Sequence, residues 1–465
     1  MKFALVAAGG EACLPRGLPE CPVFRLPDAG SKESLGKLLG WFFASGAEHL
    51  LWSLAPGVEA SWEGIDKLLG ALQASNAALA YSDYLEGSGE LHPLIDYQPG
   101  SLRDDFDFGG LALLHGARLR AIAPLIETEA PAFRQAAWYE VRLRLAGSGP
   151  VVRVGEPCYR LLLADRRPSG QKVFDYLDPR RRDAQREMEE ACTRHLRRIG
   201  AWRPPPREPP LPDDRAFPVE ASVVIPVKNR ARTIADAVKS ALSQKTAFAF
   251  NVIVVDNHSE DGTGRILEDL ARQDGRLVRI VPERTDLGIG GCWNLAVASP
   301  ACGRYAVQLD SDDLYNGDSV LARLVGEFSR APYAMVIGSY TTVDFSLRPV
   351  PPGLVDHAEW TEENGHNNAL RVGGLGAPRA FHTPTLRSIG FPDASYAEDY
   401  AVGLRMCRRF RIGRIFESLY WCRRWEDNTD ARLSLSASNR NAVFKDTLRT
   451  EEIRERQKLN QRGAA

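Results

Sequence analysis

The sequence lacks the features of a disulfide-rich, zinc-ribbon or membrane-spanning protein. Its eight cysteines include no C-x-x-C pair and have no regular spacing, which argues against a zinc ribbon and a disulfide framework. It also has no long unbroken apolar run, because the most apolar later stretch, LLGWFFASGAEHLLWSLAPG, is interrupted by Glu48 and His49. We therefore expect a soluble protein of the reducing cytoplasm without a transmembrane segment, and a peripheral position at the inner membrane face is compatible with this.

An excess of charge of either sign is also absent. The chain has 59 basic and 60 acidic residues, so no overall field attracts it to nucleic acid, and any charge-based chemistry must be local. The opening MKFALVAAGGEA has one lysine and an early Glu11, which fits a first strand ending in a Gly-Gly turn better than a signal segment. With 465 residues, of which 44% are hydrophobic, we expect two or three globular domains.

A proline-rich stretch divides the chain. AWRPPPREPPLPDDRAFPVE, from Ala201 to Glu220, forbids a helix and favours an extended spacer, and a charged helix is expected before it, from about Asp178 to Gly200. The predicted organisation is an α/β domain over 1–177, a charged helix and linker over 178–219, a second α/β domain over 220–436, and a charged C-terminal helix or tail over 437–465.

Strand and helix patterns alternate from Ala221 to Asp310, beginning with ASVVIPV as a strand and TIADAVKSALSQ as a helix. This alternation predicts a parallel, doubly wound sheet, in which ligands bind beyond the carboxyl ends of the strands. The polar residues that could bind a ligand follow those strand ends: Asn229 and Arg230, Asp256 and Asn257, and Asp310 to Asp313.

The densest polar cluster is Asp310, Asp312 and Asp313, directly after the strand YAVQLD. Neighbouring carboxylates repel each other, and a divalent cation relieves that repulsion. Oxygen ligands of this kind suit Mg²⁺ or Mn²⁺, which often use one or two carboxylates together with phosphate oxygens. The alternative is that the aspartates cap the next helix.

Two further strand ends predict binding groups. Asp256 follows a run of β-branched residues and could accept a hydrogen bond from a nucleobase imide, whereas Asp261-Gly262 is ordinary turn chemistry. In DLGIGGCWNLA the glycines, Gly290 among them, would let the backbone approach a ligand, with Asn294 one turn into the helix. This stretch is weak evidence for dinucleotide binding, because the full G-x-G-x-x-G motif is absent.

Near the C-terminal end of the second domain, Glu398 and Asp399 open a predicted helix. Ser395 and Glu398 have the spacing of a capping box, which would account for Glu398 but not for Asp399. In the first turn the helix dipole favours the ionised carboxylate that a general base requires. YWCRRWEDNTD then gathers Arg423, Arg424, Trp425 and Asn428. Its arginines could contact phosphate and its tryptophan a sugar or base, although an ordinary surface strand is an alternative.

Taken together, these motifs resemble the family 2 glycosyltransferases, which have the GT-A (nucleotide-diphospho-sugar transferase) fold. The resemblance covers about Ala221 to Asn428, and it rests on five motifs in the family's order: SVVIPVKNR, VIVVDNHSEDGT, LGIGGCWNLAV, LDSDD and EDYAVGLR.

The resemblance implies an inverting transferase that moves a sugar from a UDP-sugar or another nucleotide sugar to an acceptor. Asp399 would be the catalytic base, with Glu398 in support. Asp312 would hold Mn²⁺ or Mg²⁺, with Asp310 and, as a substitute for a histidine that many members carry, His382 as further ligands. The implied nucleotide-sugar site comprises Pro226, Val227, Asn229, Arg230, Asp256, Asn257, Gly290, Asn294, Asp310, Ser311, Asp313, Arg424 and Trp425.

The first domain is predicted to be a degenerate copy of the second. LLHGARLRAI matches AFHTPTLRSI, and the stretch from Trp138 to Tyr159 aligns without gaps with Asp399 to Tyr420. In this register the copy has apolar or small residues in place of the acidic cluster and of the Glu-Asp pair, namely Leu54, Ala55, Pro56, Gly57, Ala137 and Trp138. It is also expected to be too short for the second strand and helix. An unrelated α/β domain with chance similarity is the alternative.

Two other functions share these features. The protein could be a non-catalytic carbohydrate-binding or assembly scaffold, or a sugar nucleotidyltransferase, against which the Glu398-Asp399 pair argues. A cell-surface polysaccharide precursor, a lipid-linked glycan and a protein all fit as acceptors, and a homodimer through the first domain is compatible with the sequence. No nucleic-acid partner is expected.

Overall fold

The computed structural model describes residues 3–8, 21–163, 181–212, 216–426, 428 and 433–463. Contacts divide the chain into two compact units. The first holds the described residues within Met1–Lys172, Pro179–Trp202 and Leu433–Ala465, and the second holds those within Arg203–Arg432. The domain boundaries predicted from the sequence stay a prediction.

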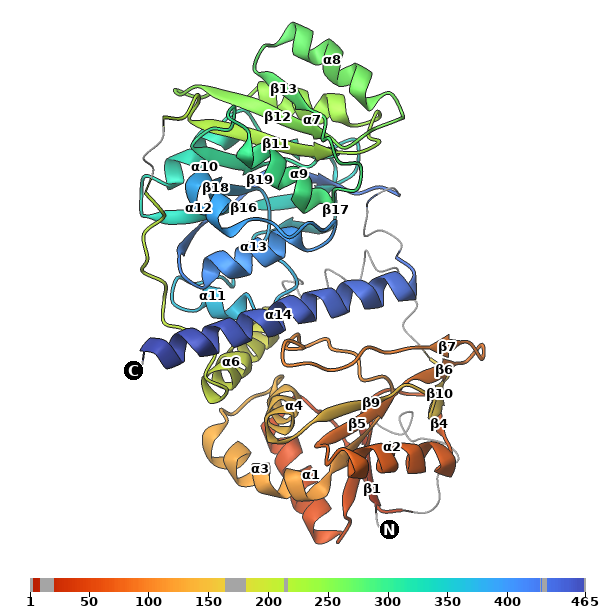
Figure 1. Ribbon diagram of the computed structural model, residues 1–465. Coiled ribbons are helices and arrows are strands. Elements are labelled where there is room, and N and C mark those ends of the chain that lie inside the picture. The colour runs from red at the N-terminus through yellow and green to blue at the C-terminus, as the bar shows by residue number, and fades with distance from the viewer. Residues whose placement is uncertain are drawn as a thin grey trace. The chain divides into compact units, whose positions relative to one another are not determined.

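The second unit is built on one nine-stranded sheet, in the order β13-β12-β11-β14-β18-β16-β19-β15, with β17 paired to β16 (Figure 1). The strands are β11 (Ala221–Val227), β12 (Phe250–Asp256), β13 (Leu277–Ile280), β14 (Tyr305–Gln308), β15 (Leu314–Tyr315), β16 (Tyr333–Val343), β17 (Pro349–Val355), β18 (Arg379–His382) and β19 (Arg411–Arg423). β13, β12, β11 and β14 are parallel, as the alternating pattern predicts. Their carboxyl ends therefore lie at one edge of the sheet.

Seven helices connect the described strands of this unit. They are α7 (Ile234–Leu242), α8 (Thr263–Gln273), α9 (Ile289–Ala298), α10 (Val320–Glu327), α11 (Gly365–Asn368), α12 (Thr383–Ile389) and α13 (Glu398–Cys407). β11 and β12 consist mainly of β-branched residues and are buried along nearly their whole length, as expected for central parallel strands covered on both faces. This rigid core fixes the positions of the loops at the carboxyl edge.

The first unit contains a six-stranded sheet, β2-β1-β3-β8-β5-β9, and a four-stranded sheet, β4-β10-β6-β7. Its strands are β1 (Phe3–Ala8), β2 (Val23–Leu26), β3 (His49–Ser53), β4 (Val58–Ala60), β5 (Leu79–Ser82), β6 (Tyr84–Glu86), β7 (Leu91–His92), β8 (Leu111–His115), β9 (Val151–Val154) and β10 (Tyr159–Leu161). Its helices are α1 (Lys32–Ala44), α2 (Trp62–Ala74), α3 (Gly116–Glu129), α4 (Ala137–Ser148), α6 (Arg182–Arg198) and α14 (Leu435–Gly463).

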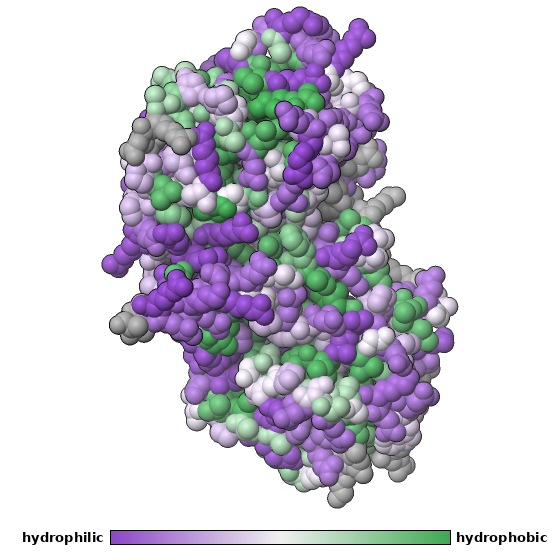
Figure 2. All heavy atoms as spheres, in the orientation of Figure 1, coloured by the Kyte–Doolittle hydropathy of each residue, from purple (hydrophilic) through white to green (hydrophobic). Residues whose placement is uncertain are grey.

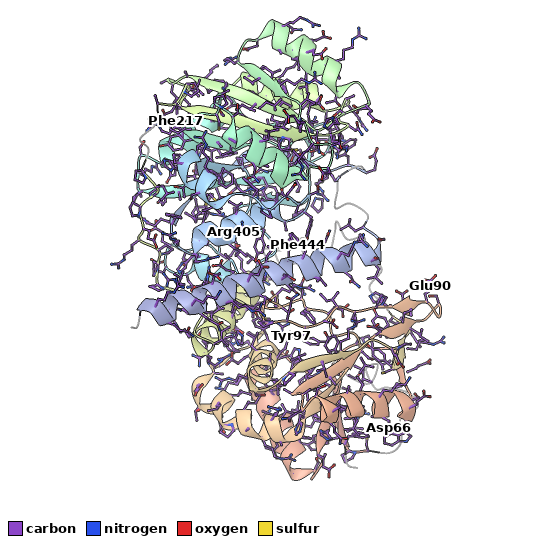
Figure 3. All side chains as sticks on the ribbon, in the orientation of Figure 1. Asp66, Glu90, Tyr97, Phe217, Arg405 and Phe444 are labelled. Carbon is purple, nitrogen blue, oxygen red and sulfur yellow. The ribbon has the colours of Figure 1, made fainter. Side chains whose placement is uncertain are left out.

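The C-terminal helix α14 packs within the first unit. Ser101 donates a hydrogen bond to Asp446 at 2.9 Å, and Gln457 donates one to the Ile199 carbonyl at 2.7 Å. Tyr97 of the same unit, labelled in Figure 3, is half-buried, and desolvation raises the pKa of its hydroxyl, with the charge of Asp446 as a smaller cause. The charged C-terminal segment therefore helps to build this unit.

The two units repeat one topology. The strands β2-β1-β3-β8-β5-β9 have the same order and the same relative directions as β12-β11-β14-β18-β16-β19. The registers also agree: His49 pairs with His115 as Tyr305 pairs with His382, and Leu79 pairs with Val151 as Met335 pairs with Ile412. The gapless alignment of Trp138–Tyr159 with Asp399–Tyr420 places Val151 on Ile412, so sheet pairing and sequence support the same repeat.

One expectation about the first unit is wrong. A second strand, β2, does pair in parallel with β1, as β12 pairs with β11. A helix also follows this strand, since α1 follows β2 along the chain as α8 follows β12. What the described part of the first unit does not contain is a counterpart of the edge strand β13.

The side chains on the face displayed in Figure 2 are mostly hydrophilic, with scattered hydrophobic residues among them. Within the described residues, no helix combines the length and the apolar character needed to cross a bilayer.

Candidate active site

The loop after β14 carries the acidic cluster. Gln308, the last residue of β14, donates from Nε2 to both carboxylate oxygens of Asp310, at 3.0 and 3.1 Å. Asp313 accepts the backbone N–H of Arg423 at 2.7 Å. The capping alternative is wrong, because α10 begins after Ser319, which makes no side-chain cap bond.

Repulsion between the carboxylates contributes to raised pKa values of two aspartates in the cluster. Burial raises the pKa of Asp310, and the charge of Asp312 adds to the effect. Burial likewise raises the pKa of Asp313, with the charges of Asp312 and Asp310 as further causes. A cation placed here would be stabilised by the same charges.

Asp312 is held by the segment after β19. The indole Nε1 of Trp425 donates to Asp312 Oδ2 at 3.1 Å, and the amide of Asn428 donates to the same oxygen at 3.4 Å. The Arg230 guanidinium lies 3.9 Å from that oxygen and 5.8 Å from the centre of the Trp425 ring. Trp425 and Arg230 therefore lie beside the acidic cluster, and their predicted contact with the nucleotide sugar stays a prediction.

Arg423, one of the two arginines of YWCRRWEDNTD, extends into this cluster. Its guanidinium bonds the Asp312 carbonyl and, at 3.1 Å, the Asp236 carboxylate, and Nη2 is buried without a partner among the described residues. The Arg424 backbone N–H bonds the Val343 carbonyl at 2.8 Å. Burial with an unused donor makes Arg423 a candidate for an anionic ligand.

At the ends of β11 and β12, Asp256 and Asn257 differ in how far their side chains are bonded within the chain. Asp256 is 1% exposed, accepts from Arg279 Nη2 at 2.6 Å, and accepts from the Ser259 backbone at 3.1 Å. Arg279 Nε also donates to Oδ2 at 3.2 Å, so this buried carboxylate accepts three hydrogen bonds from within the fold. Asn257 donates from Nδ2 to the Leu287 carbonyl at 2.8 Å, which leaves its buried Oδ1 without a partner in the described chain.

The remaining predicted residues at this edge of the sheet bond to neighbouring segments of the chain. Pro226 and Val227 end β11, and the Val227 carbonyl accepts the Asn257 N–H at 2.8 Å. Asn229 has φ 53° and accepts from the Glu260 N–H at 2.8 Å, while the Ser311 carbonyl accepts from Thr233 at 3.0 Å. A non-glycine residue in the left-handed region is strained, and such residues gather at functional loops.

The Glu398-Asp399 pair opens α13, as predicted, but no capping box forms. The helix begins at Glu398 after Ala397, which has φ 55° and makes no side-chain cap bond. Arg405 of the same helix, labelled in Figure 3, bonds the Gly390 carbonyl at 3.2 Å. Burial, then the charge of Asp399, raise the pKa of Glu398 to about 8.

Asp399 is paired with a buried arginine that the motif analysis did not single out. Arg379 Nη1 lies 2.6 Å from Asp399 Oδ2, and the Tyr400 backbone N–H bonds Oδ1 at 2.7 Å. The Asp399 side chain is 30% exposed. A lone arginine in the apolar segment before AFHTPTLRSI was the available signal for Arg379.

Three predicted residues lie elsewhere or have other partners. A side chain at Gly290 would overlap the Pro392 carbonyl, so this glycine lets the loop before α13 approach, not a ligand. Asn294 bonds the backbone N–H and carbonyl of Phe391, each at 2.9 Å. His382 pairs with Tyr305, at the opposite end of β14 from Asp310, about 16 Å away at about 3.3 Å per residue.

Few side chains in the acidic cluster could act as ligands of a divalent metal. Among the described residues, no three His, Cys, Asp or Glu side chains group closely enough to hold a metal by themselves. Asp312 Oδ1 has no bond to another described side chain, and the cluster carries excess negative charge. One or two carboxylates suffice where substrate phosphates complete the coordination, so the residues fit Mg²⁺ or Mn²⁺ bound together with a diphosphate.

The pH dependence of stability offers a check on Glu398. Because its pKa is about 8 in the fold against an ordinary 4.5, the folded state retains a proton that the unfolded chain releases between those values. This group therefore makes the protein less stable as the pH rises from about 4.5 to about 8. We expect Glu398→Gln to be more stable relative to wild type at pH 9 than at pH 5, measured as urea midpoints. An equal difference at both values would contradict the assigned pKa.

The mixed sheet, with its acidic and basic groups gathered at the carboxyl edge, defines an α/β domain of the GT-A type. Residues 222–382 match the family model for glycosyl transferase family 2, and the chain thus carries a domain of that family. The first unit adds further β-sheets with their helices, and the family model does not cover them.

Curated relatives match part of the same region. The glycosyltransferase GlyG of Streptococcus pneumoniae is 30% identical over 125 residues, which are 27% of this chain and 40% of GlyG. An uncharacterized glycosyltransferase of Rickettsia felis is 32% identical over 105 residues, 23% of this chain and 17% of that protein. The matched region thus spans less than half of either relative.

Solved structures match at lower identity. TarS 1–349 of S. aureus in complex with UDP-GlcNAc is 22% identical, with a TM-score of 0.41, over 50% of this chain and 66% of TarS 1–349. The mannosyltransferase PcManGT of Pyrobaculum calidifontis, in complex with GDP-Man and Mn²⁺, is 18% identical, with a TM-score of 0.35, over 59% and 84% of the two chains.

Proposed function

We propose that this protein transfers a sugar, with inversion, from a nucleoside diphosphate sugar to a hydroxyl group of a glycan, a lipid-linked glycan or a protein. The observation that carries the proposal is the pairing of Asp399 with Arg379 beside the acidic loop. Burial works to lower the pKa of Arg379, but the charges of Asp399, Asp310 and Glu398 raise it above its ordinary value. A candidate base and a candidate diphosphate site therefore share one charged cluster.

The transfer itself follows from this arrangement. Asp399 takes the proton of the acceptor hydroxyl, and the oxygen forms a bond to the anomeric carbon from the face opposite the diphosphate. The bond between that carbon and the diphosphate oxygen breaks, and its electron pair leaves with the nucleoside diphosphate. No covalent intermediate with the protein is required.

The leaving group carries the negative charge that the site must stabilise. Arg423, with its buried unpaired Nη2, and Arg230 are suited to bind the diphosphate oxygens. Asp312, with Asp310 beside it, would hold Mn²⁺ or Mg²⁺, which as a Lewis acid supplies charge stabilisation to the departing diphosphate.

The nucleobase is proposed to bind at Asn257. Its Nδ2 is committed to Leu287, so Oδ1 can only accept, and a buried acceptor without a partner is costly. A ring N–H, such as that of uracil or guanine, would satisfy it. This replaces the role predicted for Asp256.

For the first unit we propose a degenerate transferase-like lobe that lacks both the acidic cluster and the base. The shared strand order supports common origin, and the apolar residues at the equivalent positions argue against catalysis there. A cytoplasmic location is also proposed, because none of the seven described cysteines forms a disulfide.

A screen of nucleotide sugars tests the proposal. With Mn²⁺ present, the wild type should release a nucleoside diphosphate from at least one donor, by hydrolysis or by transfer. Release of pyrophosphate would instead indicate a nucleotidyltransferase, and binding without turnover would indicate a carbohydrate-binding scaffold.

The nucleobase contact has its own prediction. Asn257→Leu should weaken donor binding about tenfold, which corresponds to about 1.4 kcal/mol for one buried hydrogen bond. A donor methylated at the ring nitrogen, which has lost the N–H, should bind the wild type more weakly by a similar factor. Asn257→Leu should bind the methylated and the unmethylated donor with equal affinity. Independent, additive losses would contradict this contact.

A further inference from the structure

Arg379 and Gln308 connect the base to the acidic loop. Arg379 on β18 has a side chain only 13% exposed, and Nη1 bonds both the Asp399 carboxylate at 2.6 Å and the Gly376 carbonyl at 2.8 Å. Its backbone N–H bonds Gln308 Oε1 at 3.3 Å. Because Gln308 in turn bonds both oxygens of Asp310, a continuous set of bonds runs from Asp399 to Asp310.

The first unit shows that the fold does not need these polar groups. The paired positions His49–His115 and Tyr305–His382 place Trp52 where Gln308 stands and Ala112 where Arg379 stands. The gapless alignment places Trp138 where Asp399 stands. The same strands nevertheless pair in the same order.

Apolar packing replaces the network in the first unit. Trp52 is 1% exposed, and its ring centre lies 4.2 Å from that of Trp138. The first unit, which lacks the acidic cluster, thus also lacks counterparts of Asp399, Arg379 and Gln308. Their joint presence in the second unit indicates a role in the reaction and not in sheet formation.

We propose that Arg379 is a positioning residue that holds the Asp399 carboxylate oriented toward the acceptor hydroxyl, with Gln308 aligning it to the acidic loop. This inference rests on the proposed function. A carboxylate has about four acceptor sites, so the bonds from Arg379 and Tyr400 leave room for the acceptor hydroxyl on the exposed part of Asp399.

The electrostatic reason lies in the surrounding charges. Asp399 is adjacent to Glu398, and both contribute, with Asp310, to the field at Arg379. Removing the guanidinium would leave the negative charges of Glu398, Asp399 and Asp310 uncompensated, and we therefore expect the pH dependence of the reaction to change. Lysine would restore the charge but not the two-point geometry of arginine.

The test compares the pH dependence of kcat in wild type, Arg379→Met and Arg379→Lys. For Arg379→Met we expect kcat at pH 7 to fall about 10²-fold and the acidic limb of its profile to move to higher pH. Arg379→Lys should return the limb toward the wild-type position with an intermediate kcat. The affinity for the nucleotide sugar, measured by calorimetry, should change less than about threefold.

A matched control is Arg371→Met, which removes another buried arginine of the same unit, bonded to Asn368 at 2.9 Å. It should leave the profile of kcat against pH unmoved. A loss of donor affinity in Arg379→Met without any displacement of the limb would overturn the proposal. If Arg379→Met does not fold, the test rests on Arg379→Lys. The proposal is then overturned if this variant has the wild-type kcat and the acidic limb of its pH profile lies at the wild-type position. An inactive wild type would instead refute the proposed function.

Discussion

Asp399→Asn is expected to bind the nucleotide sugar as the wild type does and to transfer it about 10² to 10⁴ times more slowly. The amide has nearly the shape of the carboxylate but cannot take the acceptor proton. Steady-state kcat with the best donor and acceptor measures the loss, and calorimetry with the donor alone measures binding.

Two controls accompany this variant. Because Arg379 loses its charged partner at 2.6 Å, the thermal midpoint should be recorded to separate lost chemistry from lost folding. Asp269→Asn, on the surface of α8, should retain wild-type kcat, since its partner is Arg272 of the same helix. A folded Asp399→Asn protein with wild-type kcat would remove Asp399 from the mechanism.

Asp312→Ala should abolish the response of donor binding and turnover to Mn²⁺ and reduce kcat/KM about 10²- to 10³-fold, the cost of losing one stabilising contact to developing charge. The substitution also frees the Trp425 indole and the Asn428 amide, which both bond Asp312 Oδ2. Titration of donor binding against Mn²⁺ therefore reports the effect more directly than activity alone.

The matched control is Asp318→Ala in the same loop. Asp318 is exposed and pairs with Lys245 at 2.7 Å, away from the cluster. It should keep the Mn²⁺ dependence of the wild type. Should Asp312→Ala respond to Mn²⁺ as strongly as Asp318→Ala does, the metal assignment fails, although a transferase without a metal would still be compatible with Asp399 as base.

Local pattern was sufficient for the elements and for the acidic residues at their ends. The run ASVVIPV predicts β11, which extends over Ala221–Val227, and the predicted strand before Asp310 is β14. Asp310, Asp312 and Asp313 were identified because carboxylates are rare directly behind a buried strand. A cluster that is close in sequence is necessarily close in space, so no knowledge of the fold was needed.

Residues separated in the chain were harder to assign. His382 was proposed as a substitute for a histidine that the family resemblance implies, but antiparallel pairing places it beside Tyr305, at the wrong end of β14. Gly290 and Asn294 lie in a suggestive motif, yet they pack against Phe391 and Pro392 before α13. Neither the direction of a partner strand nor the course of a distant loop is encoded in a short window.

The order of apolar and polar residues was by itself enough to predict two α/β regions and the carboxyl-edge position of the charged groups, since these depend on periodicity and local spacing. The family resemblance rested on five short motifs, which are also local. Tertiary structure alone decided which partners those groups have: Arg379 with Asp399, Arg423 with Asp312 and Asp313, and Asn257 with its unpaired oxygen. Hydrogen bonds and charges act over a few ångströms, and only folding brings residues that are tens or hundreds of positions apart within that range.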